Sequence, residues 1–596
     1  MKKTNNTSNF IYSLAVVLVA VLFMGYVGDY FFDLNDDVLM KDMLSGAYTG
    51  APEAHNIQML YPISAFISMF YRAVRCVNWY GIFLCICQYL CVFLISYKAL
   101  QTCAKNVRKI VTALFMLFFS LGVIGAHFLF VQYTFTCGLM SATAAFLILT
   151  HKKDKDKNYG IAFWLILVAF LLRSEMLLLT LPLVCVAIFI RWMLNMKKEE
   201  FFDCLKLFGA IVVALLIATG IHSFAFSSPE WKEYCDFFDA RTELYDFQAG
   251  FQEVLDYEEN KEFYDDIGID KSEYELLKNY NFGIDDNIDA DVLWKVAKQT
   301  EKNKTDGKPF GQSLKEALSV YIHGLHNFSA QKSYEMDSDR YYPYNLIVMI
   351  LYLGVLISYV LPRQDSSRKE TLCVVGALIL LFMCRTTLWL YIIMRGRIPI
   401  RISHPLYLAE IMVLFAMLLM RAEKSVLCPY KVVAVVAALS LLSVPDQKTA
   451  ISSELHAREL MREHYDALYD YFAENEENFY FMDVYTSVSC ENDMAEGEAT
   501  FSEKIFDRVD NSYANHDLMG GWGVKSPLTV KKLSRAGYSD MQSGLLAQNA
   551  YLVQTKSDED GIDWIIDYYR NKGIEVTVDR ETIIADAFAI YAVRGK

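Results

Sequence analysis

Eleven apolar stretches constrain this chain more than any other feature of its sequence. They fall at 10-28, 80-100, 110-130, 131-150, 161-173, 175-194, 205-226, 344-361, 371-393, 405-421 and 427-445. A helix needs about 20 predominantly apolar residues to cross the hydrocarbon core of a bilayer. Although 54% of the residues are hydrophobic, long polar segments separate the apolar stretches. We therefore predict a polytopic α-helical membrane protein with about 11 transmembrane helices.

Lysine and arginine are distributed unevenly over the connecting segments. Most of those in the loops lie at 105-109, 152-157, 197-198, 363-369 and 421-424. Because cytoplasmic loops carry an excess of positive charge, we expect these segments on the cytoplasmic side of the plasma membrane. This predicts a cytoplasmic N-terminus, a transmembrane domain over 1-445 with outer loops at 29-79 and 227-343, and an extracytoplasmic domain over 446-596.

The extracytoplasmic segments have enough pattern to predict their own elements. The large outer loop 227-343 is expected to be helical, with helices at 229-247, 271-280, 290-300 and 311-328. After a helical run at 451-474, the tail has strand patterns at 478-485, 550-554, 574-579 and 587-594, and a helix at 559-572. This alternation predicts a small, soluble α/β domain. The run Met519-Gly520-Gly521-Trp522-Gly523 lacks the spacing of a nucleotide-binding fingerprint and predicts a turn.

Composition excludes two classes of protein. The formal net charge is -14, whereas a nucleic-acid-binding protein would present a basic face. Most of the 13 cysteines lie in apolar runs, and none forms a CxxC pair. We therefore expect neither nucleic-acid binding nor a framework of disulfides or zinc.

Three carboxylates follow the first apolar stretch, on the side of the membrane opposite the N-terminus. If residues 33 to 37 are helical, Asp33, Asp36 and Asp37 lie three and four positions apart, where like charges repel one another. A bound proton, a cation or a ligand would offset that repulsion. The alternative is a solvated acidic helix start, because carboxylates favour helix N-termini.

A charged pair interrupts two apolar stretches. The run from Ile161 to Leu172 is too short to cross the bilayer, since 12 helical residues span about 18 Å. We predict two short helices that meet at Arg173 and Glu175, as either a structural ion pair or part of a site.

Arginines also gather at the predicted outer ends of the ninth and tenth helices, against the charge rule. They are Arg385, Arg395, Arg397 and Arg401, with His404 close by. Guanidinium groups bind phosphate in a bidentate manner, so these arginines indicate an anionic ligand or, alternatively, partners for the acidic outer loops. Arg241 is a candidate for the site entrance or for a surface ion pair, and Glu53 and His55 either flank the site or belong to a capped turn.

The sequence Asn35-Asp36-Asp37, followed by Leu39-Met40 and Leu44-Ser45-Gly46, resembles the acidic motif in the first outer loop of GT-C glycosyltransferases. These integral membrane enzymes use polyprenyl-phosphate sugars. The resemblance covers residues 10-445, and the tail resembles the extracytoplasmic α/β domains of bacterial members.

The resemblance implies an inverting transfer of a sugar from a polyprenyl-phosphate-linked donor to an envelope polymer, glycolipid or protein. It makes Asp36 or Asp37 the general base, and it suggests Arg395, Arg397, Arg401 and Arg173 as phosphate ligands. Supporting residues are Asp33, Glu53, His55, Glu175, Arg241 and His404. Two carboxylates suit a divalent cation, and the spacing leaves its presence open. The alternatives are a lipid or solute transporter, a flippase, or a non-catalytic scaffold for envelope assembly.

Overall fold

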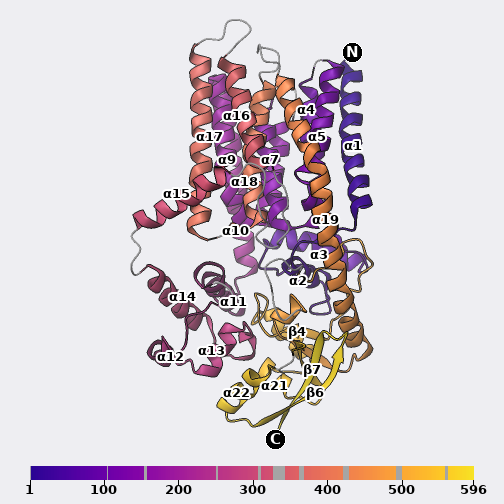
Figure 1. The fold of residues 1–596 in the computed structure, drawn as a ribbon, viewed down its shortest axis with the longest axis vertical. Helices are drawn as coiled ribbons and strands as arrows, with labels where there is room; N and C mark the ends of the chain where they lie inside the picture. The colour runs from indigo at the N-terminus through magenta and orange to yellow at the C-terminus, as the bar shows by residue number, and fades with distance from the viewer. Residues whose placement is uncertain are drawn as a thin grey trace.

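The computed structural model describes residues 2-103, 105-152, 157-249, 253-305, 310-326, 343-360, 368-396, 398-420, 429-490, 500-557 and 561-596. A bundle of long helices forms one end of the molecule, and the polar segments gather at the other end (Figure 1). The chain begins at the end of the bundle that points away from the C-terminal domain. The predicted fold class, a helical membrane protein with a C-terminal α/β domain, is confirmed.

The bundle is built around two central helices. All 17 residues of α7 (Tyr133–Leu149) are buried, as are most residues of α18 (Ile400–Met420). The surrounding helices are α1 (Lys2–Val27), α4 (Trp79–Gln101), α5 (Asn106–Gly122), α6 (Gly125–Leu129), α8 (Asn158–Leu172), α9 (Ser174–Asn195), α10 (Lys198–Ala225), α16 (Tyr344–Val360), α17 (Arg368–Met394) and the first part of α19 (Pro429–Glu474).

The outer surface of the bundle is apolar, as a lipid-facing surface must be. On α10, Leu216 and Phe224 are 66% and 81% exposed, and on α1, Leu22 is 71% exposed. A helix with apolar residues on all its faces is either deeply buried or surrounded by lipid. Because these side chains are exposed in the folded chain, they face the bilayer.

Seven helices in the described part of the chain are long and apolar enough to cross a membrane. All eleven predicted stretches coincide with helices, but α5, α7, α8 and α16 have only 15 to 17 residues. At 1.5 Å per residue they span about 22 to 26 Å. That these four shorter helices also cross the membrane stays a prediction.

The predicted break at Arg173 is present. Arg173 separates α8 from α9 and has an extended backbone, with φ -154° and ψ 97°. The backbone N–H of Leu60, in the first outer loop, donates a 2.8 Å hydrogen bond to the carbonyl of Leu171. The break therefore lies against the first outer loop rather than in the middle of the bundle.

The first outer loop contains two helices, α2 (Asn35–Ser45) and α3 (Tyr61–Ala73). A short parallel pairing of β1 (Phe31–Phe32) with β2 (Phe130–Val131) fixes the start of the loop to the bundle. Asp33 lies between β1 and α2, so it is not on a common helix with Asp36 and Asp37. Gly46 ends α2 with a φ of 100°, a conformation that favours glycine.

The large outer loop is helical, as predicted, although it contains more helices than expected and the one predicted at 290-300 extends to 305. They are α11 (Pro229–Arg241), the π-helix η1 (Thr242–Gln248), α12 (Lys261–Asp266), α13 (Lys271–Lys278), the 3-10 helix η2 (Phe282–Ile284), α14 (Ala290–Thr305) and α15 (Phe310–His326). Apart from α15, which lies along the bundle, these helices pack beside the C-terminal domain (Figure 1).

The C-terminal domain has a five-stranded sheet in the order β4-β3-β5-β7-β6. β3 (Phe479–Met482) is parallel to β4 (His516–Leu518) and β5 (Ala550–Thr555), whereas β7 (Phe588–Gly595) is antiparallel to β5 and β6 (Val576–Ile584). The helices are α20 (Pro527–Ala536), α21 (Met541–Leu545) and α22 (Asp563–Asn571), with the 3-10 turn η3 (Tyr485–Ser487). The sequence did not predict strand β4.

Helix α19 joins the membrane bundle to this domain without a break. Its 46 residues pass through Pro445 and include the predicted boundary at 445/446. Proline is tolerated within a long helix at the expense of one backbone hydrogen bond. The run predicted at 451-474 is therefore the second half of a helix that begins in the bundle.

Buried polar contacts join the C-terminal domain to the first outer loop. The hydroxyl of Tyr48 donates a 3.1 Å hydrogen bond to Asp517 at the edge of the sheet. Lys41 on α2 pairs with Glu503 at 2.7 Å. These contacts hold α2 from the side opposite the bundle.

The Asp517 contact predicts a pH-dependent stability. Burial raises the pKa of Asp517 to about 6 from its usual value of 3.8. Between these values the folded chain holds a proton that the unfolded chain has released, so raising the pH from about 4 to 6 lowers the free energy of unfolding by about 2 kcal/mol. Asp517→Asn removes this dependence, so its stability relative to wild type is expected to increase from pH 4 to 7. Thermal unfolding across that range measures the difference.

The control is Asp579→Asn, on the exposed edge of β6. Burial lowers the pKa of His516 to about 3, so the titration of this histidine raises the free energy of unfolding as the pH rises. It is present in both proteins, so the comparison of Asp517→Asn with wild type isolates the carboxyl group. A difference in stability between Asp517→Asn and wild type that stays constant across this pH range would contradict the prediction.

Candidate functional site at the outer end of the bundle

Two neighbouring aspartates in the first turn of α2 have different surroundings. Asp36 is half-buried, and its Oδ1 accepts a 2.9 Å hydrogen bond from the indole N–H of Trp522. Asp37 is fully buried, and its Oδ1 accepts a 2.8 Å hydrogen bond from the Tyr80 hydroxyl. Successive side chains on a helix point about 100° apart, so the two carboxylates have separate partners.

Burial favours the neutral form of Asp37. Burial raises its pKa well above the ordinary value, and the charges of Asp36 and Asp33 add to that effect, against hydrogen bonds from Tyr80 and the Tyr133 backbone. Its Oδ2 has no hydrogen-bond partner in the described part of the chain. Asp37 is buried and bonded to Tyr80, whereas Asp36 is partly open, so Asp36 is the better candidate for a general base.

Arg173 lies at the break between α8 and α9. Its guanidinium donates hydrogen bonds to the side-chain and backbone oxygens of Gln58. It also pairs with Glu175 at 3.2 Å and lies 5.3 Å from the ring centre of Tyr133. The Glu175 side chain is 69% exposed. The predicted ion pair is therefore present, and it is open on the Glu175 side.

Arg241 reaches the same region from the large outer loop. It is the last residue of α11, and its buried guanidinium donates a hydrogen bond to the Tyr280 hydroxyl and lies 3.5 Å from Asp246. The Asp36 carboxylate interacts electrostatically with both Arg173 and Arg241. We call Asp36, Arg173, Arg241 and Asp246 the charge cluster.

The predicted outer arginines have separate positions. Arg395, in the turn after α17, has its guanidinium carbon 5.0 Å from the ring centre of Phe247, the residue after Asp246. It therefore lies beside the segment that contributes to the charge cluster. Arg401 is half-buried in the first turn of α18, and Arg397 lies outside the described residues.

His404 belongs to a second polar site inside the bundle. A cavity of about 220 Å³ lies between α15, α17 and α18, and both His404 and Arg385 line it. His404 makes a 2.7 Å hydrogen bond with His127, and Arg385 pairs with the buried Glu410 at 3.2 Å. The lining includes no member of the charge cluster. Arg385 lies within α17, not at its outer end where the sequence predicted it.

Asp33, Glu53 and His55 were also predicted as site residues, but they have partners outside the charge cluster. Asp33 accepts a 3.3 Å hydrogen bond from the buried Arg458. The ring of His55 stacks on an indole with a centroid distance of 4.8 Å. The partners are Arg458 for Asp33, Lys531 for Glu53 and Trp231 for His55.

Several residues around the charge cluster were not predicted from the sequence to belong to the site. They are Gln58, Tyr80, Tyr133, Tyr280 and Trp522. Their only local signal is polarity within apolar or turn segments, which many structural residues share. Glu410 has a clearer signal in the sequence, because a carboxylate inside an apolar helix is rare.

The structure offers no multidentate metal site among the described residues. No group of three or more histidine, cysteine, aspartate or glutamate side chains is placed to hold a metal ion there. Asp36 and Asp37, suggested by the sequence as a pair of ligands, instead have hydrogen bonds to Trp522 and Tyr80.

Comparison with known proteins gives a distant structural similarity. No family model matches the chain, and no curated protein matches it. Two solved structures of ArnT from Cupriavidus metallidurans align over 97% of both chains with 11% sequence identity. The TM-score is 0.39 for ArnT bound to undecaprenyl phosphate and 0.38 for its apo state. The chain is thus similar to ArnT over nearly its whole length, and at this level the similarity assigns no activity to it.

Proposed function

We propose that the chain is an integral membrane glycosyltransferase of the GT-C type, which transfers a sugar from a polyprenyl-phosphate donor to an extracytoplasmic acceptor. The charge cluster carries this proposal. It combines a half-buried carboxylate, Asp36, with two guanidinium groups, Arg173 and Arg241. Transfer from a lipid phosphate needs a base for the acceptor and cations for the leaving group.

Asp36 acts as the general base in this proposal. The acceptor hydroxyl loses its proton to the Asp36 carboxylate while its oxygen bonds to the anomeric carbon of the sugar. The bond from that carbon to the phosphate oxygen breaks, and the electron pair leaves with the polyprenyl phosphate. A single displacement of this kind inverts the anomeric configuration. Burial raises the pKa of Asp37 and favours its protonated form, so Asp37 is not assigned the proton of the acceptor in this proposal.

Arg173 and Arg241 stabilise the phosphate as negative charge develops on it. A guanidinium group presents several N–H donors in one plane and matches a phosphate in a bidentate manner. The position of Arg173 between two membrane helices suits a lipid-linked donor that arrives from the bilayer. Arg395, which lies over the ring of Phe247 next to Asp246, is a candidate for an additional phosphate contact.

The proposed orientation follows the loop charges. The positively charged connecting segments lie in the cytoplasm, and the charge cluster, the large outer loop and the C-terminal domain lie outside the plasma membrane. The acceptor then approaches from the extracytoplasmic side and is an envelope polymer, a glycolipid or a protein.

Arg173→Met is expected to raise the KM for the donor by roughly 10- to 100-fold, because it removes charged hydrogen bonds to the phosphate. Its effect on the acceptor KM is expected to be small. Since Glu175 is largely exposed, the change leaves no buried unpaired charge at that residue. The measurement uses purified protein in lipid nanodiscs, a panel of polyprenyl-phosphate sugars and undecaprenyl phosphate as a competitor.

The matched control is Arg570→Met, which removes an exposed guanidinium on α22 that pairs with Asp567. An unchanged donor KM and unchanged competition by undecaprenyl phosphate in Arg173→Met would count against the phosphate assignment. Absence of sugar release from every donor by the wild-type protein would count against the proposed function itself.

A further inference from the structure

The glycine-rich turn 519-523 of the C-terminal domain reaches the charge cluster. It follows β4 and passes beside the large outer loop on its way to α20. A Cβ atom on Gly520 would lie 1.7 Å from the backbone oxygen of Tyr280, and Gly521 has a φ of 89°. Both positions therefore need glycine. The turn places Trp522 against Asp36.

The backbone of this turn is fixed on several sides. The carbonyl of Met519 accepts a 2.8 Å hydrogen bond from Gly283, in the large outer loop. The hydroxyl of Tyr234 on α11 donates a 2.6 Å hydrogen bond to the carbonyl of Trp522. Gly523 packs so closely on α2 that a Cβ atom there would lie 3.2 Å from the Leu39 side chain. The indole thus has little freedom to move relative to α2.

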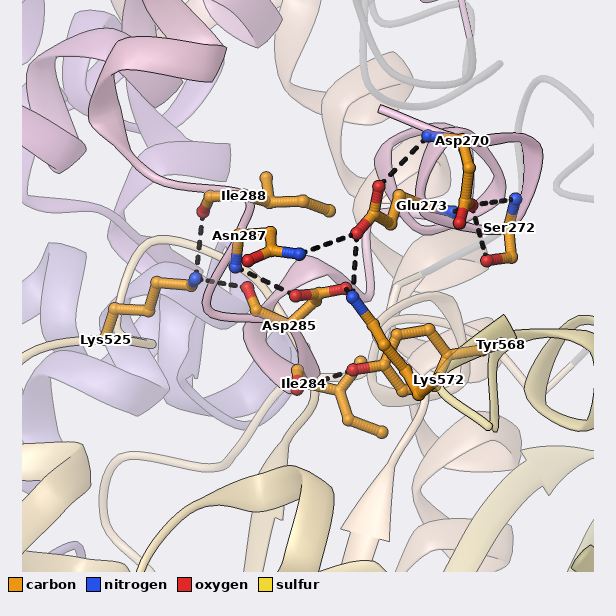
Figure 2. Close-up of polar contacts among 10 residues, drawn as sticks. All are labelled: Asp270, Ser272, Glu273, Ile284, Asp285, Asn287, Ile288, Lys525, Tyr568 and Lys572. Carbon is orange, nitrogen blue, oxygen red and sulfur yellow. Dashed lines mark hydrogen bonds and ion pairs between the residues drawn. The ribbon is translucent and has the colours of Figure 1, made fainter. Parts of the chain in front are cut away.

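Two lysines of the C-terminal domain strengthen this attachment (Figure 2). Lys525 has a left-handed backbone, with a φ of 60°, and its ammonium donates to the carbonyls of Asp285 and Ile288 at 2.5 and 2.9 Å. Lys572, directly after α22, pairs with Glu273 and Asp285 at 2.8 Å each. The outer loop and the domain are therefore joined three residues beyond Trp522.

We propose that Trp522 is a positioning residue for Asp36, so that the C-terminal domain completes the active site of the membrane domain. This inference rests on the proposed function. The indole N–H donates to Oδ1 of Asp36, which orients the carboxylate. The other oxygen, Oδ2, is left to accept the proton of the acceptor hydroxyl. Trp522 touches the base and need not touch the substrate.

Trp522→Phe tests the proposal, because it removes the N–H donor and keeps an aromatic ring. We expect kcat to fall roughly tenfold. The acid limb of the pH–rate profile is expected to move to higher pH, because the variant removes a hydrogen-bond donor from the base. The donor KM is expected to stay within about twofold of wild type. Transfer measured between pH 4.5 and 8 gives all three quantities.

Trp294→Phe is a matched control. Its indole N–H also donates to an aspartate, Asp236, at 3.1 Å, but that pair is exposed and includes no member of the charge cluster. We expect a wild-type pH profile for this variant. If Trp522→Phe does not fold, Lys525→Met is used in its place. This variant loosens the turn that holds Trp522 against Asp36, so we expect the acid limb to shift in the same direction.

The outcomes separate this inference from the proposed function. A wild-type acid limb in Trp522→Phe, together with loss of transfer in Asp36→Asn, would overturn the positioning role and leave the proposed function intact. Full transfer by Asp36→Asn would overturn the assignment of the base, and the positioning role with it. A lower kcat without a shift of the acid limb would show a structural role only, and would also overturn the inference.

Discussion

Asp36→Asn is expected to lower kcat for sugar transfer by roughly 10²- to 10⁴-fold, the range that a positioned general base contributes. The amide cannot accept the proton of the acceptor hydroxyl at neutral pH. It can still accept the hydrogen bond from Trp522, so the turn that contacts α2 should stay in place. The donor KM is expected to change little, because the arginines are retained. Steady-state transfer with a single donor and a saturating acceptor measures the effect.

The neighbouring residue supplies the sharpest control. In Asp37→Asn the new amide resembles the protonated carboxyl that burial favours, since burial raises the pKa of Asp37. We expect a loss of kcat far smaller than that of Asp36→Asn. Asp29→Asn, whose side chain is 64% exposed, is expected to transfer like wild type. Equal losses in Asp36→Asn and Asp37→Asn would contradict the assignment of Asp36 as the base.

Arg458→Met is expected to have the largest effect on stability, a loss of about 3 to 5 kcal/mol in the free energy of unfolding. Arg458 on α19 is 2% exposed, and it donates to the carbonyl of Phe32 at 2.8 Å and to Asp33 at 3.3 Å. It also pairs with Glu454, one turn earlier, at 3.1 Å. Without the guanidinium, two buried carboxylates lose a shared cation, and β1 loses its attachment to α19.

Chemical unfolding in detergent micelles, followed by tryptophan fluorescence, measures this loss. Arg462→Met is the matched control, because Arg462 lies one turn further along α19 and pairs with two half-exposed aspartates. Pairs of that kind contribute about 0 to 1 kcal/mol. Addition of Glu454→Gln to Arg458→Met is expected to recover part of the loss. A loss in Arg458→Met no larger than that in Arg462→Met would contradict the structural role of Arg458.

The membrane helices were predictable because their signal is local. Each one is a run of apolar residues, and the break at Arg173 is visible in the length of the run before it. The continuation of α19 through Pro445 was not predicted, because proline and a change in composition normally indicate a boundary. Packing of the second half of α19 on the sheet and on β1 offsets the cost of that proline.

The site was predictable only in part. Asp36, Arg173 and Glu175 were visible as charges in unfavourable sequence contexts. Their partners come from remote parts of the chain, since Trp522 is 486 positions from Asp36 and Gln58 is 115 positions from Arg173. Periodicity indicates which face of a helix is buried, but it does not identify what covers that face. The turn at 519-523 therefore looked like a plain connection.

One measurement tests the central claim most directly. Wild-type protein and Asp36→Asn are reconstituted in proteoliposomes with a polyprenyl-phosphate sugar and an acceptor, and the lipid fraction is analysed by mass spectrometry. We predict that wild type converts the donor to free polyprenyl phosphate with inversion at the anomeric carbon, and that Asp36→Asn leaves the donor intact. Intact donor that moves across the bilayer without loss of its sugar would contradict a transferase and would indicate a transporter.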